Sequence, residues 1–166
     1  MKPVVGIIMG SDSDLGVMQE ATKVLKQFEV AYEIGVYSAH RSPHRTLEYV
    51  KSARDRGLRV IIAGAGSSAH LAGVTAAETT LPVIGVPIDS SPLSGLDSLL
   101  STVQMPPGVP VATMGVGKSG ATNAAFFALQ ILALGDEKLA RKLAEYKEQL
   151  EKAVAEKSRK VSEQDG

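Results

Sequence analysis

The residues best suited to chemistry lie in the stretch Val36–Pro43, which reads Val-Tyr-Ser-Ala-His-Arg-Ser-Pro. His40 supplies an imidazole, a group with an ordinary pKa of about 6.5 that both gives and takes protons near neutrality. Arg41 supplies a permanent cation whose planar fork fits a phosphate. The pair suggests proton transfer beside an anionic ligand. The alternative is structural: His40 would only form a hydrogen bond within a turn, and Arg41 would be an ordinary surface residue.

The same stretch predicts where these side chains lie. An apolar segment ends at Tyr37, and Ser42 followed by Pro43 is a strong signal for the start of a helix. We expect the Ser42 side chain to cap the exposed amides of that helix. His40 and Arg41 are therefore expected at a turn between a strand and a helix.

Short apolar runs alternate with amphipathic runs along the chain. The apolar runs predict strands over residues 3–9, 30–37, 59–63, 82–86 and 111–116. The amphipathic or small-residue runs predict helices over 17–28, 43–57, 71–79, 96–103, 121–134 and 136–157, with a frayed polar tail over 158–166. Because crossovers between parallel strands are right-handed, helices should cover both faces of one sheet. We predict an α/β protein, a three-layer α/β/α sandwich of flavodoxin-like type with about five parallel strands and an extra C-terminal helix.

The predicted strand exits are rich in glycine and serine. In parallel sheets a ligand binds outside the carboxyl ends of the strands, near the point where the strand order reverses. Small residues there let backbone amides approach a ligand, although tight turns alone would also favour them. We expect these loops to converge on one site.

Composition limits the classes of function. The 166 residues are 44% apolar and carry no formal net charge, which fits one domain, residues 1–166, and offers no broad surface for nucleic acid or anionic membrane. There is no cysteine, and the first apolar run is too short for a signal peptide or a membrane span. A soluble cytoplasmic protein without nucleic-acid or membrane partners is expected.

The C-terminal part suggests subunit contacts. The helix predicted over 121–134 is apolar nearly all round, and the helix after Asp136, which should act as its cap, has one narrow apolar seam. We expect a core of about 4–134 followed by an oligomerisation helix of about 136–157. Docking of that helix on its own domain is the alternative.

Three motifs are incomplete. Gly64-Ala65-Gly66 begins a dinucleotide fingerprint but has Ala69 at the third glycine, and Gly115–Gly120 resembles a phosphate-binding loop without its first glycine. Pro43 begins a helix between His40 and His44, so these two histidines lack the i, i+4 helical pairing of a zinc site. We predict neither metal nor cofactor.

Several short motifs, taken together and in order, resemble the PurE family of purine biosynthesis from about Val5 to Leu134. They are Gly10–Asp14, Ser38–Pro43, Gly64–Gly66 with His70-Leu71, Gly85–Pro87, Ser94–Ser98 and Gln104–Pro106. Ala69-His70-Leu71 is similar to the branch that acts as N5-carboxyaminoimidazole ribonucleotide mutase. Ser67, Ser68, Ala72 and Asp89 depart from the family's usual pattern.

The resemblance implies an isomerase that moves a carboxylate from an exocyclic amine to the neighbouring ring carbon, without cofactor or metal, and a homo-octamer. By family analogy His40 shuttles the proton, while His70 bonds the substrate or supports the wall of the site. The substrate-binding residues implied are Ser11, Ser13 and Arg41 for the 5′-phosphate, Asp14 for the ribose, Gly66 and Ser67 in the turn that walls the base, and also Ser38 and Ala39.

Two other functions fit the residues. One is the family's second branch, an aminoimidazole ribonucleotide carboxylase that uses free carbon dioxide. The other is a non-enzymatic flavodoxin-like module that binds FMN or another phosphorylated ligand at the polar strand exits.

Overall fold

The computed structural model describes residues 2–164. Five strands form one parallel sheet in the order β2-β1-β3-β4-β5. They are β1 (Val5–Met9), β2 (Tyr32–Val36), β3 (Val60–Gly66), β4 (Val83–Ile88) and β5 (Ala112–Thr113). The predicted parallel sheet of about five strands is confirmed, and its order is that of flavodoxin-like folds.

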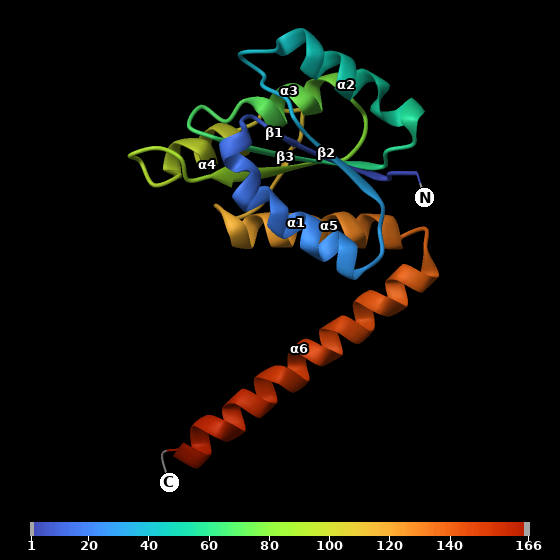
Figure 1. The fold of residues 1–166 in the computed structure, drawn as a ribbon, viewed down its shortest axis with the longest axis vertical. Helices are drawn as coiled ribbons and strands as arrows, with labels where there is room; N and C mark the ends of the chain where they lie inside the picture. Colours follow the sequence, from blue (N-terminus) through green and yellow to red (C-terminus); the bar gives the residue numbers. More distant parts are fainter. Residues whose placement is uncertain (1, 165–166) are drawn as a thin grey trace. The chain divides into compact units, whose positions relative to one another are not determined.

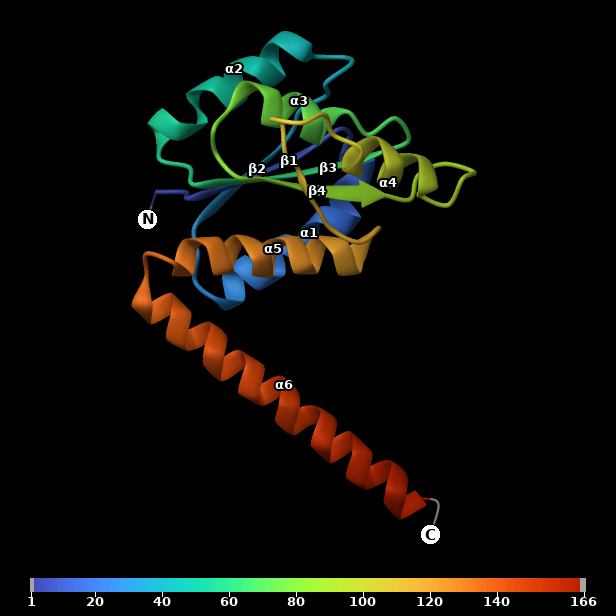
Figure 2. The ribbon, with the colours of Figure 1, turned by 180° about the vertical axis from the view of Figure 1, so that it is seen from behind.

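Helices cover both faces of this sheet. In chain order, the helices of the described residues are η1 (Asp12–Asp14, a 3₁₀ turn), α1 (Leu15–Gln27), α2 (Pro43–Arg56), α3 (Leu71–Glu78), α4 (Leu96–Val103), α5 (Lys118–Ala133) and α6 (Glu137–Gln164). Figures 1 and 2 show α2 and α3 on one face and α1 with α5 on the other. The predicted three-layer arrangement is thus confirmed.

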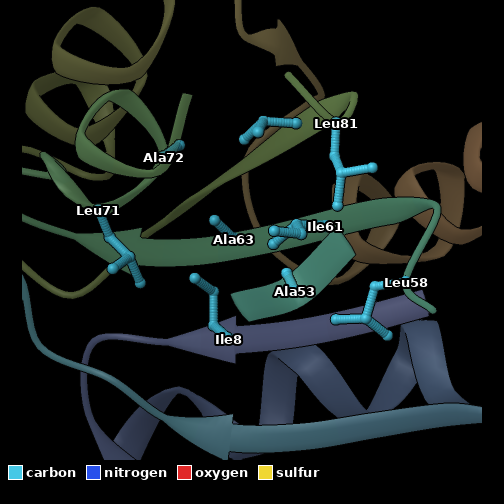
Figure 3. Close-up of a cluster of buried hydrophobic side chains, with 9 residues drawn as sticks. Ile8, Ala53, Leu58, Ile61, Ala63, Leu71, Ala72 and Leu81 are labelled. Atoms are coloured by element: carbon cyan, nitrogen blue, oxygen red, sulfur yellow. The ribbon is translucent and has the colours of Figure 1, made fainter. Parts of the chain in front are cut away.

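The core lies on the central strands. Every residue of β1 and of β4 is buried. On one face a cluster joins Ile8 and Ile61 of the sheet to Ala53 of α2 and Leu71 of α3 (Figure 3). The buried residues of α1 recur on one side of that helix, and those of α2 do the same, so each helix packs one apolar side against the sheet. Packing against both faces fixes the sheet on which the loops stand.

Gly64 allows α1 to pack closely on the opposite face. A Cβ at this position would collide with the sulfur of Met18, which is fully buried. Glycine in the middle of a strand is therefore required here by the close approach of a helix.

Three strands end more than one residue away from the predicted ends. β3 continues through Gly66 and β4 through Ile88, because residues 64–66 pair with 86–88 and the glycines do not end the ladder. Pro87 fits in β4 because β5 is only two residues long and pairs no further along β4 than Gly85, whereas we expected a strand over 111–116. The sequence signal of glycine and proline as strand terminators is overridden by strand pairing.

The chain divides into two compact units, residues up to Ala128 and residues from Leu129 on, so the predicted single domain stays a prediction. In the second unit, Asp136 caps α6 as predicted, because its Oδ1 accepts from the Leu139 amide at 3.0 Å. α6 runs to Gln164 rather than ending near Lys157, and the Arg159–Glu163 ion pair at i, i+4 supports its last turns. The predicted frayed tail was wrong over residues 158–164, and 165–166 lie outside the described residues.

Within residues 2–164, no helix combines the length and the apolar content that crossing a bilayer requires.

Candidate active site

A cavity of about 310 Å³ lies at the carboxyl ends of the strands, beside the reversal of strand order between β1 and β3. The loops after β1, β2, β3 and β4 all contribute to its wall. Every predicted site residue lines it: Ser11, Ser13, Asp14, Ser38, Ala39, His40, Arg41, Gly66, Ser67 and His70. The structure therefore brings together all the predicted site residues, whereas the loop after β5, which was also expected at this site, contributes none of the lining residues.

Ser11 and Asp14 close the loop after β1 in a capping box. The Ser11 amide donates to Asp14 Oδ2 at 3.1 Å, and the Ser13 amide donates to Ser11 Oγ at 3.4 Å. The hydroxyls form a chain in which Ser13 Oγ lies 2.9 Å from Ser11 Oγ, which lies 3.1 Å from Asp12 Oδ1. Both hydroxyls are at the cavity and can turn toward a ligand without disturbing the backbone.

Asp14 is a buried carboxylate on the cavity wall, with 5% of its surface exposed. Burial raises its pKa above the ordinary value, although the Ser11 amide and the nearby Arg41 charge act in the opposite direction. An acceptor held in this way suits a ligand hydroxyl and disfavours an anion.

The turn after β2 is fixed by its two serines. The Ser42 amide donates to the Ser38 carbonyl at 3.0 Å, and the Ser38 amide donates to Ser42 Oγ at 3.2 Å. α2 begins at Pro43 as predicted, but Ser42 makes no side-chain capping bond to the helix. The expected cap was wrong because the Ser42 hydroxyl is already used within the turn.

Arg41 links this turn to the end of β1. Its amide donates to Ser38 Oγ at 3.1 Å, and its Nη2 donates to the Gly10 carbonyl at 3.0 Å. The guanidinium is thus held at the cavity beside Asp14 while it keeps further donors for an anion.

Aromatic and arginine side chains stack on Tyr37, the residue just before this turn. The Tyr37 and Tyr49 rings have centroids 4.3 Å apart, with the guanidinium of Arg45 over the Tyr37 ring and that of Arg56 over the Tyr49 ring. These residues border a larger cavity of about 500 Å³. No predicted site residue lines that cavity, and its Arg56 is already paired with Glu33 at 2.9 Å. We therefore assign the candidate site to the smaller cavity.

His40 and His70 contact each other, although they are 30 residues apart in the chain. His40 Nε2 and His70 Nδ1 are 2.7 Å apart, and the rings meet edge to face at 88°. β2 and β3 flank β1, so the turn that follows each of them reaches over the end of β1. The sequence predicted that both residues lie at the carboxyl ends of the strands, but it did not predict the bond between them.

The loop after β3 forms one wall of the cavity. Its shape depends on the backbone strain at Ser67 and on the close approach of Ser90 to Gly66. Ser67 has a φ of 51°, in the left-handed region, and α4 supports the loop because Ser101 Oγ accepts from the Ala69 amide at 2.9 Å. A Cβ at Gly66 would collide with the Ser90 side chain. Five lining residues were not among the predicted site residues: Gly10, Ala65, Ser68, Leu71 and Ser90. For Ser90 the available signal was its position in the polar loop after β4.

The chain matches the family model described as AIR carboxylase over residues 4–153. It is 58% identical over 158 residues to the N5-carboxyaminoimidazole ribonucleotide mutase of Bacillus subtilis (strain 168), which covers 95% of this chain and 98% of the relative. The protein of that name from Pyrococcus abyssi is 61% identical over 150 residues, 90% of this chain and 85% of the relative. The crystal structure of Treponema denticola PurE has a TM-score of 0.84 at 30% identity and covers 93% of this chain and 95% of that one.

Replacing Asp14 by Asn should stabilise the protein at neutral pH. Because burial raises the pKa of Asp14, the native state holds its proton more tightly than the unfolded chain, and stability falls as pH rises above the ordinary value of 3.8. The amide side chain of the variant would keep an oxygen for the Ser11 amide without the cost of burying a charge. We expect a larger free energy of unfolding for Asp14→Asn at pH 7, and a smaller gain at pH 4, in chemical denaturation.

Asp12→Asn is the matched control, since Asp12 is an exposed carboxylate of the same loop. It should change stability little at either pH. An Asp14→Asn protein less stable than the parent at pH 7 would show that the attraction to Arg41 outweighs the cost of burial.

Proposed function

Because the chain belongs to the AIR carboxylase family, also called PurE, we propose that it is a mutase of purine biosynthesis. The reaction converts N5-carboxyaminoimidazole ribonucleotide into 4-carboxy-5-aminoimidazole ribonucleotide. The observation that carries the proposal is the cavity itself, which combines groups suited to a phosphate, to sugar hydroxyls and to proton transfer. Two relatives that share more than half of the sequence bear the mutase name.

Arg41, Ser11 and Ser13 would hold the 5′-phosphate. All three present hydrogen-bond donors to the cavity, and the guanidinium adds a charge-assisted contact. Asp14 would accept from the ribose hydroxyls, because a phosphate placed against its carboxylate would be repelled. Ser38, Ala39, Gly66 and Ser67 would then form the walls around the base.

The chemistry needs one group that gives a proton and later takes one back. As the bond between the exocyclic nitrogen and the carboxyl carbon breaks, the electrons stay on nitrogen, which takes a proton from His40. The ring carbon then attacks the released carbon dioxide and forms the new carbon–carbon bond. Neutral His40 removes the proton from that ring carbon, which restores the starting state. Neither an oxidant nor a net proton is needed.

The substrate requirement tests the proposed reaction. We expect the purified protein to convert the carbamate N5-carboxyaminoimidazole ribonucleotide without added bicarbonate, and to show little turnover of aminoimidazole ribonucleotide with bicarbonate. Efficient use of the amine with bicarbonate would instead establish the carboxylase branch. A yellow protein with a flavin spectrum and no turnover of either nucleotide would favour the flavodoxin-like binding module.

Replacing His40 by Asn should lower kcat by about 10²-fold to 10⁴-fold, the usual contribution of a positioned proton donor. Asn keeps a polar side chain at this exposed position, so the fold and nucleotide affinity should be retained in calorimetry. His44→Asn is the control, because His44 is exposed on α2 and does not line the cavity. Equal turnover in the two variants would remove His40 from the chemical step.

We propose further that the chain forms a homo-octamer in the cytoplasm, without nucleic-acid or membrane partners. The zero formal net charge supports the absence of polyanionic partners. The seam of α6 supports subunit contacts, because Leu150, Val154 and Val161 are 49%, 66% and 62% exposed.

Leu150→Glu should reduce the particle mass seen in light scattering, because it places a charge within this seam. Ala155→Glu is the matched control: it adds the same charge at an exposed position on another side of α6. A parent protein that is monomeric at micromolar concentration would contradict the proposed assembly.

A further inference from the structure

The hydrogen bond between His40 and His70 joins a ring in an exposed turn to a ring whose backbone is held on both sides. His70 lies between two residues of the core, Ala69 and Leu71, which are 1% and 2% exposed. Its amide donates to the Ser68 carbonyl at 2.8 Å, and its carbonyl accepts from the Val74 amide at 2.9 Å. The backbone of His70 is therefore fixed on both sides of the ring.

His40 lies in the exposed turn between β2 and α2. The bonds that define this turn are made by its neighbours Ser38, Arg41 and Ser42. The His40 ring is hydrogen-bonded through Nε2 to His70 Nδ1, at 2.7 Å. The position of the ring thus depends on His70.

The bond also determines which nitrogen atoms carry protons. It needs one donor and one acceptor, so two imidazolium rings cannot maintain it. If His40 Nε2 donates, both neutral rings carry their proton on Nε2, which is the more stable tautomer of a free histidine side chain. If His70 Nδ1 donates, both rings must adopt the less stable tautomer. We assign the proton to His40 Nε2.

We propose that His70 is a positioning residue for His40, which holds its Nε2–H and leaves Nδ1 as the nitrogen that exchanges protons with the substrate. This inference rests on the proposed function, in which His40 performs the proton transfer. Protonated His40 gives its Nδ1 proton to the exocyclic amine, and Nδ1 of the neutral ring later takes the proton from the ring carbon. Nε2–H stays bonded to His70, which remains neutral throughout, and the charged groups on the same wall are Asp14 and Arg41.

Asn and Gln at position 70 separate this role from direct contact with the substrate. The amide of Asn lies close to where Nδ1 of histidine lies, whereas the amide of Gln reaches the place of Nε2. An Asn can therefore keep an acceptor for His40, and a Gln loses it. His70 is exposed, so both polar variants should fold, which their melting temperatures will check.

Nitrogen-15 NMR of the full chain labelled at histidine reads the tautomer without any assay of activity. The chain has three histidines, and the His40 signals are identified by their loss in His40→Asn. At pH 8 we expect His40 to carry its proton on Nε2 in the parent and in His70→Asn, and to gain a measurable share of the Nδ1-protonated tautomer in His70→Gln, where no acceptor holds Nε2–H. His44 is the internal reference and should not change. An unchanged His40 tautomer in His70→Gln would overturn the proposal.

Kinetics with the carbamate substrate give the second test. His70→Gln should lower kcat by about 10²-fold with little change in KM, since a misplaced reacting group loses about this much. His70→Asn should keep most of the turnover. Activity in His70→Gln with loss in His70→Asn would overturn the proposal and give His70 a direct contact through Nε2. If the parent does not turn over the carbamate, the proposed function fails, while the NMR result still decides whether His70 orients His40.

Discussion

The pairing of β1 with β2 on one side and β3 on the other is the constraint on which the candidate site depends. The Met9 carbonyl accepts from the Tyr37 amide at 2.8 Å, and the Gly10 amide donates to the Gly64 carbonyl at 3.1 Å. Because these bonds continue the ladders past the end of β1, the turn after β2 and the loop after β3 leave the sheet side by side. The strand pairing therefore brings His40 and His70, which are far apart in the chain, within hydrogen-bond distance of each other.

Much of this arrangement could be predicted from the sequence, because it depends on local signals. Buried apolar runs predicted the strands, and Pro43 marked the start of α2. The small polar residues after each strand indicated that the site lies at the carboxyl ends of the strands. The boundaries of β3 and β4 could not be predicted in the same way. Gly64 and Pro87 have strand-ending propensities, and the neighbouring strand that keeps them in the ladder is not visible in a local window.

The side-chain bonds of the site were beyond sequence reasoning for a different reason. Ser42 has the right type and place for a helix cap, yet its hydroxyl bonds to Ser38, and the choice between two nearby partners is made by the geometry of the turn. The contact of His40 with His70 likewise depends on how two loops leave the sheet. The sequence identified which residues lie together at the carboxyl ends of the strands. The folded geometry decided how their hydrogen-bond donors and acceptors are paired.

The hydrogen bonds within the cavity are of two kinds: those that a bound ligand would replace, and those that would persist when it binds. The contact of Ser13 with Ser11 joins exposed hydroxyls that can rotate. The bond from the Ser11 amide to Asp14 is different, because it closes the loop and satisfies a buried carboxylate. The contact of His40 with His70 is anchored through the core residues beside His70. A phosphate would thus exchange the mobile bonds for its own, while the anchored bonds keep the acceptor and the imidazole pair in place, so little ordering is left to be done when a ligand binds.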